Sequence, residues 1–135
     1  MVRQKHAFGC GVACVSIATN ISYDRICAML GENQAAQSGF SCKELCQTLS
    51  VLGTVYEYHY LKPRLSNRIY KEGVIVFLKR SQKYPAGHYL IRHKNKWHDS
   101  WINFSPGADI KGARPGLRAR LPYRPSYALF PYNKN

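Results

Sequence analysis

The spacing of apolar residues along the chain changes near Gly53 and divides it into two parts. Before Gly53, apolar residues recur every three or four positions, which is the period of an amphipathic helix. After Gly53, apolar and polar residues alternate or form short runs rich in β-branched and aromatic side chains, a pattern that favours strands. Helices followed by strands predict an α+β fold, with N-terminal helices packed on an antiparallel sheet.

Three helices are predicted in the helical part. The first begins near Cys10 and ends around residue 20. The second covers about residues 23–30, between a serine that can cap its start and a glycine that ends it. The third has the clearest signature, because Ser41 and Glu44 have the spacing of a capping box.

The strands are predicted at residues 54–61, 73–78, 88–92, 96–102 and 127–130. The continuous apolar run at 73–78 is typical of a central strand that is buried on both faces. Residues 93–95 have the composition of a turn between two neighbouring strands. The Gly/Pro-rich stretch from about 104 to 125 predicts a long irregular loop.

The length of 135 residues corresponds to one domain, with a helical part of about 1–53 and a sheet part of about 54–135. The hydrophobic content of 45% is enough for a core, which excludes wholesale disorder. No apolar run approaches the roughly 18–20 residues of a membrane span, and no signal peptide opens the chain. We therefore expect a cytoplasmic protein, an expectation that is compatible with delivery as a toxin.

The chain is strongly basic, with 20 Lys and Arg residues against 7 Asp and Glu residues and a formal charge of +13. Such an excess suggests an anionic partner, such as nucleic acid, an anionic membrane or an acidic protein, or it serves solubility alone. No acid follows Asp109, whereas six cations do. Five of them are candidates for binding a substrate or partner, namely Lys111, Arg114, Arg118, Arg120 and Arg124; the sixth is Lys134.

Five cysteines without a secretory signal argue against a disulfide framework. Two pairs have a spacing of four residues, Cys10 with Cys14 and Cys42 with Cys46. Both pairs lie in apolar helical contexts, where a free cysteine behaves as a small hydrophobic residue, and not in the tight knuckles of a structural zinc site. The sequence therefore predicts neither a metal site nor an organic cofactor.

Cys10 has the surroundings of a nucleophile. The thiolate is the reactive form of cysteine, and at the ordinary pKa of about 8.5 it is a minority species at neutral pH. Cys10 lies at the predicted start of a helix, where the partial positive charge stabilises a thiolate. The flanking Gly9 and Gly11 would let a substrate approach the sulfur, and Cys14, one turn later, is expected on the buried side of the helix.

His88 and Asp99 are candidates for the acid–base partners of this cysteine. His88 lies at the head of a predicted strand, where its ring could take the thiol proton. Asp99 lies in the next strand among large apolar residues, where an acid is costly without a partner, so that it could orient the His88 ring. The other strand histidines, His59, His93 and His98, are expected on the sheet surface.

Gln4 lies six residues before Cys10 and could donate its side-chain amide to an oxyanion. The whole segment 4–14, Gln-Lys-His-Ala-Phe-Gly-Cys-Gly-Val-Ala-Cys, resembles the N-terminal motif of the bacteriocin-processing, double-glycine-leader peptidases. These enzymes are papain-like cysteine peptidases. His88, with the preceding glycine and the apolar residues that follow, resembles their second motif, and Asp99 resembles their third. The resemblance extends to about residue 103.

The resemblance implies a papain-like fold, in which the helical part carries the cysteine and the sheet carries histidine and aspartate. It implies Cys10 as nucleophile, His88 as general base and acid, Asp99 as the orienting acid and Gln4 as oxyanion donor. The chain departs from the family in two ways. Asp99 is followed by Ser-Trp where the family typically has proline, and the spacing from His88 to Asp99 is shorter than in many members.

The leading functional hypothesis is a stand-alone cysteine hydrolase, specifically a peptidase acting on a peptide or protein substrate. Without a transporter domain or transmembrane segment, processing of a peptide during export is not expected. The alternative is a bacterial toxin of papain-like fold that cleaves or binds RNA through its basic surface. A catalytically inactive binding module is a third hypothesis. An inhibitor or immunity protein is a further candidate partner.

Overall fold

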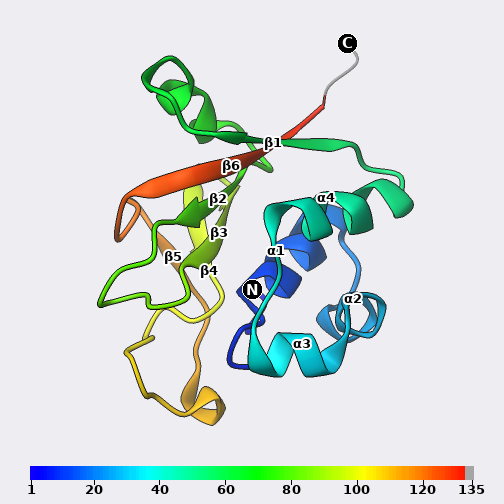
Figure 1. Ribbon diagram of the computed structural model, residues 1–135, viewed down its shortest axis with the longest axis vertical. Helices are drawn as coiled ribbons and strands as arrows, with labels where there is room; N and C mark the ends of the chain where they lie inside the picture. Colours follow the sequence, from blue (N-terminus) through cyan, green and yellow to red (C-terminus); the bar gives the residue numbers. More distant parts are fainter. Residues whose placement is uncertain (133–135) are drawn as a thin grey trace.

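The computed structural model describes residues 1–132 and consists of a group of helices packed against one face of an antiparallel sheet (Figure 1). The helices are α1 (Cys10–Thr19), α2 (Tyr23–Leu30), α3 (Glu32–Gln37) and α4 (Cys42–Val51). The strands are β1 (Tyr56–Tyr60), β2 (Ile75–Leu78), β3 (His88–His93), β4 (Lys96–Asp99), β5 (Gly116–Arg118) and β6 (Pro125–Pro131). Their order in the sheet is β1-β6-β2-β3-β4-β5. The predicted α+β fold class is confirmed.

The three predicted helices correspond to α1, α2 and α4. The side chain of Ser22 caps α2, and Ser41 and Glu44 form the predicted capping box at the start of α4. The short helix α3 was not predicted. It follows α2 directly through Gly31, whose φ of 119° breaks the helical path, and only Ala35 of its six residues is buried, so it carries no apolar periodicity.

The five predicted strands correspond to β1, β2, β3, β4 and β6. The apolar strand β2 lies in the interior of the sheet between β6 and β3, as its sequence predicts. The turn between β3 and β4 has Lys94 and Asn95 at φ values of 53° and 62°. Two consecutive positive φ values are characteristic of the tight turn that suits the twist of a two-stranded hairpin. This hairpin places the start of β3 next to the end of β4.

The prediction of an irregular loop over residues 104–125 is wrong for part of that range. Residues 116–118 form the strand β5, which pairs antiparallel with β4, and a short 3-10 helix, η2 (Ile110–Gly112), precedes it. A strand of three residues is too short to show an alternating pattern, which explains why the sequence did not reveal it. A second 3-10 helix, η1 (Pro63–Tyr70), lies between β1 and β2 and was also not predicted.

Both faces of the sheet are covered by apolar clusters. On one face the helices pack against strand residues that include Ile75 and Leu129. On the other face, a second cluster joins Val76 and Leu78 to Ile69 of η1 and to the loop residue Tyr84. Among residues 1–132, no helix combines the length and the apolar character needed to cross a membrane.

Gly87, directly before β3, provides a test of how this strand is positioned. Its φ is 74°, and a Cβ atom there would overlap the Phe77 ring and lie 2.9 Å from the Leu78 carbonyl oxygen. We expect Gly87→Ala to lower the free energy of unfolding by about 2–4 kcal/mol in urea titrations. The control is Gly112→Ala, because no atom lies within 4 Å of the added Cβ there. An equal effect of the two substitutions would contradict this account.

Candidate active site

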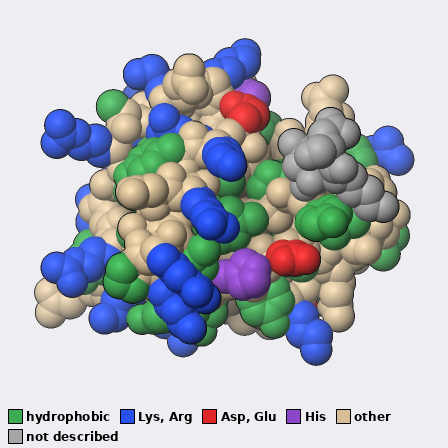
Figure 2. All heavy atoms as spheres, turned by 90° about the horizontal axis from the view of Figure 1, so that it is seen from above, with side chains coloured by type: hydrophobic (Ala, Val, Ile, Leu, Met, Phe, Trp, Pro, Cys, Tyr) green, Lys and Arg blue, Asp and Glu red, His purple; other side chains and the backbone are tan. Residues whose placement is uncertain are grey.

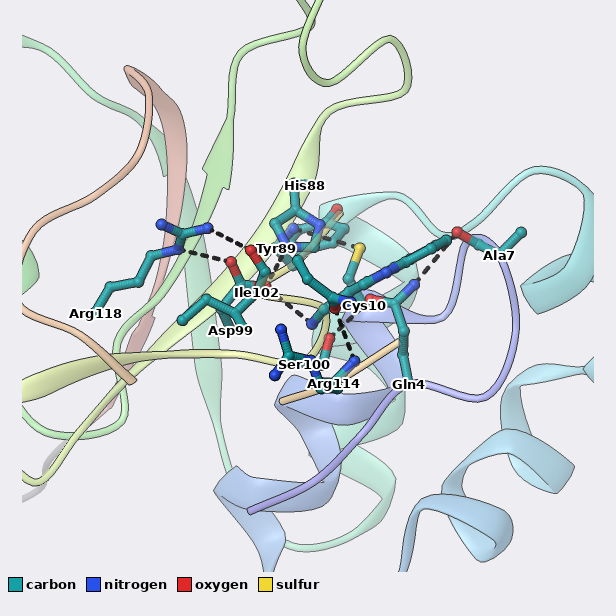
Figure 3. Close-up of polar contacts among 12 residues, drawn as sticks. Gln4, Ala7, Cys10, His88, Tyr89, Asp99, Ser100, Ile102, Arg114 and Arg118 are labelled. Carbon is teal, nitrogen blue, oxygen red and sulfur yellow. Dashed lines mark hydrogen bonds and ion pairs between the residues drawn. The ribbon is translucent and has the colours of Figure 1, made fainter. Parts of the chain in front are cut away.

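The four site residues predicted from the sequence meet at one place, where the start of α1 faces the sheet (Figure 3). Cys10 is the first residue of α1, His88 the first residue of β3 and Asp99 the last residue of β4. Gln4 belongs to the N-terminal segment, whose backbone is hydrogen-bonded to Ser100 just beyond β4 (Gln4 N to Ser100 O, 3.2 Å). Residues that are far apart in the sequence therefore converge because α1 packs on β3 and the hairpin closes β3 onto β4.

His88 and Asp99 form a buried pair. The His88 Nε2 atom lies 2.7 Å from Asp99 Oδ1, and the two side chains are 5% and 0% exposed. The strand register explains the contact. Because Ile91 pairs with His98, Asp99 lies opposite Leu90. Leu90 is on the same face of the sheet as His88, which is two residues before it in β3. Since Nε2 is directed at Asp99, the other ring nitrogen of His88 is left for the cysteine.

The Cys10 sulfur lies beside the His88 ring at the half-buried start of α1 (Figure 3). The backbone N–H of Tyr89 donates to the sulfur over 3.4 Å. The N–H of Cys10 itself is at the first position of the helix, where it has no acceptor within the helix. The sulfur therefore accepts from a backbone donor and lies beside an imidazole.

The charges of this site support one another. Burial alone would lower the pKa of His88, but the Asp99 carboxylate and the Cys10 sulfur outweigh it and raise this pKa to about 10. Burial likewise opposes the charged form of Asp99, but its hydrogen bond to His88 and the positive charge there lower its pKa to about 2. At neutral pH the pair therefore exists as imidazolium and carboxylate.

The glycines that flank Cys10 have another role than the one expected from the sequence. Both Gly9 and Gly11 are buried. A Cβ atom on Gly9 would overlap the Tyr23 hydroxyl, and one on Gly11 would approach the Leu45 side chain at 3.1 Å. They let the start of α1 pack closely on α2 and α4, so they are packing residues and do not open the approach to the sulfur.

The Gln4 side chain is held in place by hydrogen bonds at both ends of its amide. Its Oε1 accepts from the Ser100 hydroxyl at 2.8 Å, and its Nε2 donates to the carbonyls of His6 (3.0 Å) and Ala7 (3.3 Å). Gln4 is 1% exposed, yet it lines the same cleft as Cys10. The amide thus has a fixed orientation with its nitrogen on the side of the loop that leads into α1.

Arg118, expected at a partner-binding surface, is instead part of this site. Its Nε donates to Asp99 Oδ2 at 2.8 Å, and its Nη2 donates to the Ile102 carbonyl at 3.0 Å. The backbone N–H of Trp101 donates to Asp99 Oδ1 at 3.0 Å. The side chains of Lys111, Arg114, Arg120 and Arg124 are exposed and make no ion pair within residues 1–132. Lys134 lies outside the described residues.

Two aromatic residues that sequence reasoning missed enclose the histidine. The Tyr84 ring is stacked on His88 with a centroid distance of 5.2 Å and an interplanar angle of 4°. Phe104 lies near both rings, at 6.3 Å from His88 and 5.6 Å from Tyr84. Tyr84 is almost fully buried and comes from the loop between β2 and β3, so no local pattern links it to the site. These rings shield the imidazole from water and fix its plane.

The sulfur opens onto a cleft of about 850 Å³ between the helices and the sheet. One wall is formed by the segment that leads into α4, and the other by the end of the loop before β3 and by the segment near Phe104. Aromatic side chains line much of it, among them Phe8, Phe40, Phe77 and Tyr127. A cleft of this size accommodates several residues of an extended chain or a small molecule.

The expectation that His98 lies on the sheet surface is wrong. His98 is 2% exposed, and its Nε2 accepts a hydrogen bond from the Val2 N–H at 3.1 Å. Burial lowers its pKa to about 4, so the ring is neutral at physiological pH. It points away from Asp99, as alternation predicts, but the N-terminal segment covers it. His93 and His59 are partly or fully exposed and lie near Glu72 and Glu57.

All five cysteines are free thiols, and Cys14 is buried on the inner side of α1 as predicted. Burial raises the pKa of Cys14, of Cys27, of Cys42 and, to about 11, of Cys46. In the part of the chain that the structure describes, no three His, Cys, Asp or Glu side chains are grouped as metal ligands. Cys10 is thus set apart from the other thiols by its surroundings.

Comparison with known proteins does not assign this chain to a family. No protein-family model matches the sequence, and no curated protein matches it. The function must therefore be inferred from the chemistry of the cleft, in which a half-buried thiol, a protonated imidazole, a buried carboxylate and a fixed amide lie together.

Arg118 is expected to contribute to stability at acid pH through its hydrogen bond to Asp99. The pKa of Asp99, about 2, is below its ordinary value of 3.8, so the contribution of this carboxylate is complete above pH 4 and lost as pH falls toward 2. Arg118→Gln should lower the unfolding free energy at pH 7 by about 1.5–3 kcal/mol, and the deficit should shrink between pH 4 and 2. Urea titrations at several pH values measure this, with the exposed Arg120→Gln as control. A pH-independent deficit would contradict it.

Proposed function

We propose that the protein is a cysteine peptidase with a papain-like fold, using Cys10 as nucleophile, His88 as general acid and base, and Asp99 as the residue that orients His88. The observation that carries the proposal is the buried His88 ring, held by Asp99 at 2.7 Å on one side and facing the Cys10 sulfur on the other. A protonated imidazole next to a thiol at an open cleft is the arrangement that nucleophilic thiol chemistry requires.

Catalysis would proceed through a thioester. Cys10 attacks as the thiolate, with its proton on His88: a sulfur electron pair forms the bond to the substrate carbonyl carbon, and the carbonyl π electrons move to oxygen. When the tetrahedral intermediate collapses, the C–N bond breaks and His88 donates its proton to the leaving amine. The neutral imidazole then removes a proton from water, whose oxygen attacks the thioester carbonyl. Collapse of this second intermediate releases the acid and returns sulfur and imidazole to their starting state.

The oxyanion of both intermediates would be bound by the Cys10 N–H and the Gln4 side-chain amide. The Cys10 N–H is free of helical partners because it is at the first position of α1. The Gln4 Nε2 donates to the Ala7 carbonyl over 3.3 Å, the longer of its two bonds. We propose that this bond is exchanged for the oxyanion, while the Ser100 hydroxyl keeps the amide oriented.

The papain-like assignment is supported by the arrangement of the elements and by the resemblance of segment 4–14 to the double-glycine-leader peptidases. The helix that carries Cys10 packs on the strand that carries His88. The Ser-Trp that replaces the usual proline has local functions, since Ser100 binds the Gln4 amide and the Trp101 N–H binds Asp99. The departure from the family pattern is therefore consistent with a working site.

The RNA-acting alternative has one observation in its favour. The cleft is lined by Lys43 from α4 and Arg80 from the loop after β2, and no acid within residues 1–132 pairs with either side chain. A general base on a ribose hydroxyl must be neutral before it accepts a proton. The Asp99 carboxylate and the Cys10 sulfur raise the pKa of His88 and so favour its protonated form, which favours thiol chemistry over this mechanism.

Selective alkylation of Cys10 tests the nucleophile. Iodoacetamide should label Cys10 rapidly at both pH 6 and pH 8, because His88 is positively charged at both values. The four other thiols should react slowly, since burial raises the pKa of each. His88→Ala should slow Cys10 labelling at pH 6 by about tenfold or more, and His88→Gln serves as a variant that keeps a polar partner for Asp99. Labelling of Cys10 at the rate of Cys14, measured by mass spectrometry, would overturn the proposal.

A substrate panel distinguishes the two functions. We expect peptides to be cleaved by the intact protein and not by Cys10→Ala, with a loss of about 10²–10⁴-fold in kcat/KM for His88→Ala. Total tRNA should remain intact under the same conditions. Cleavage of tRNA that survives Cys10→Ala would favour the RNA-acting alternative.

A further inference from the structure

A second cavity, of about 580 Å³, lies outside the candidate active site on the opposite face of the sheet. It is formed where η1 lies against β1 and the end of β6, and it shares no lining residue with the cleft at Cys10. Glu57 and His59 line it, whereas Tyr56 on the other face of β1 belongs to the helix-side core. We refer to this cavity, with Arg64, Arg68 and Lys71 on its walls, as the η1 groove.

Part of the lining of the η1 groove comes from a basic stretch of the chain. Residues 62–71 contain four cations and no acid, namely Lys62, Arg64, Arg68 and Lys71, all of them exposed. Figure 2 shows Lys and Arg side chains gathered across this face of the molecule.

Two acids, Glu57 and Glu72, line the groove, and Glu72 is held by hydrogen bonds. Glu72 accepts from the His93 ring and from the Lys94 N–H, both at 2.8 Å. The Glu57 carboxylate lies 3.5 Å from His59. Within residues 1–132, no carboxylate lies within 4.0 Å of the charged groups of Arg64, Arg68 or Lys71. The three cations are thus available to an anionic ligand.

Apolar and aromatic groups accompany these cations. The half-buried Leu65, Phe130 and Pro131 line the groove, and the Tyr132 ring at its edge is 55% exposed. A groove that combines several cations with an exposed aromatic side chain suits a chain of phosphates carrying stackable bases. An acidic peptide would use the cations, but a base offers the tyrosine ring a larger planar face than a carboxylate side chain does, so the ring favours nucleic acid.

We propose that the η1 groove binds single-stranded nucleic acid, with Arg64, Arg68 and Lys71 contacting phosphates and Tyr132 stacking on a base. All three side chains line the groove, Arg64 and Arg68 from η1 and Lys71 from the residue that follows it. Guanidinium groups bind phosphate oxygens through paired hydrogen bonds, which strengthens the contact beyond simple charge attraction. This binding goes beyond the proposed peptidase activity and does not depend on it.

A matched pair of double variants separates this groove from the general effect of a +13 charge. Arg64→Gln/Arg68→Gln removes two cations from the groove, and Arg120→Gln/Arg124→Gln removes two exposed cations from the C-terminal segment. Fluorescence anisotropy with a labelled single-stranded RNA of about 12 nucleotides measures affinity at several salt concentrations. We expect the groove variant to lose about tenfold in affinity or more and the magnitude of its salt slope to fall by about 1.4, which corresponds to two lost phosphate contacts.

The C-terminal variant should change affinity by less than about twofold. Equal losses in the two variants would show unspecific attraction to the whole surface and would overturn the proposal. A labelled poly-glutamate peptide of equal charge serves as the competing ligand, and tighter binding of this peptide to the groove would also overturn it. Tyr132→Ala should weaken RNA binding severalfold and leave peptide binding unchanged, whereas an equal effect on both would contradict the stacking contact.

Discussion

The buried carboxylate of Asp99 is the constraint on which the candidate site depends. An unpaired charge with no exposure to water would cost several kcal/mol, so the surrounding chain must supply donors. Three donors do so, the His88 ring, the Trp101 N–H and the Arg118 guanidinium. They come from β3, from the residues after β4 and from β5. The carboxylate therefore holds together the three strands at one edge of the sheet. Its negative charge favours the protonated form of His88, and the positive charge of that ring in turn stabilises the carboxylate.

The same pair links the sheet to the helices. Because Asp99 keeps His88 protonated, the start of α1 next to it is a favourable place for a thiol that carries negative charge. Close packing at Gly9 and Gly11 sets the position of α1, and the N-terminal segment, held by Ser100 and His98, places Gln4 beside it. Each site residue is thus positioned by a contact that also holds the fold together.

The parts of the fold that were predicted from the sequence are those with strong local signals. The capping box of α4, the apolar run of β2 and the turn between β3 and β4 each specify their element within a few residues. The pairing of His88 with Asp99 could be expected for the same reason, because a short turn fixes the strand register. Arg118 could not be placed, since a three-residue strand carries no periodic signal and the residue is reached only through tertiary pairing. The prediction for His98 was wrong because the N-terminal segment, whose position was not predicted, covers the face of β4 that was expected to be exposed.

The net charge shows most clearly why composition alone does not identify a binding surface. Arg118 and the arginines of η1 are counted equally in a sum of +13, yet Arg118 neutralises a buried acid, whereas Arg64 and Arg68 face a groove. A cation that is paired inside the fold is unavailable to a ligand, and an exposed one with no carboxylate within 4.0 Å among residues 1–132 is available. The distinction depends on burial and partners, which are properties of the folded chain. The cations of a basic protein that can reach a ligand are therefore identified from the folded chain, and the proposal for this chain places them at η1.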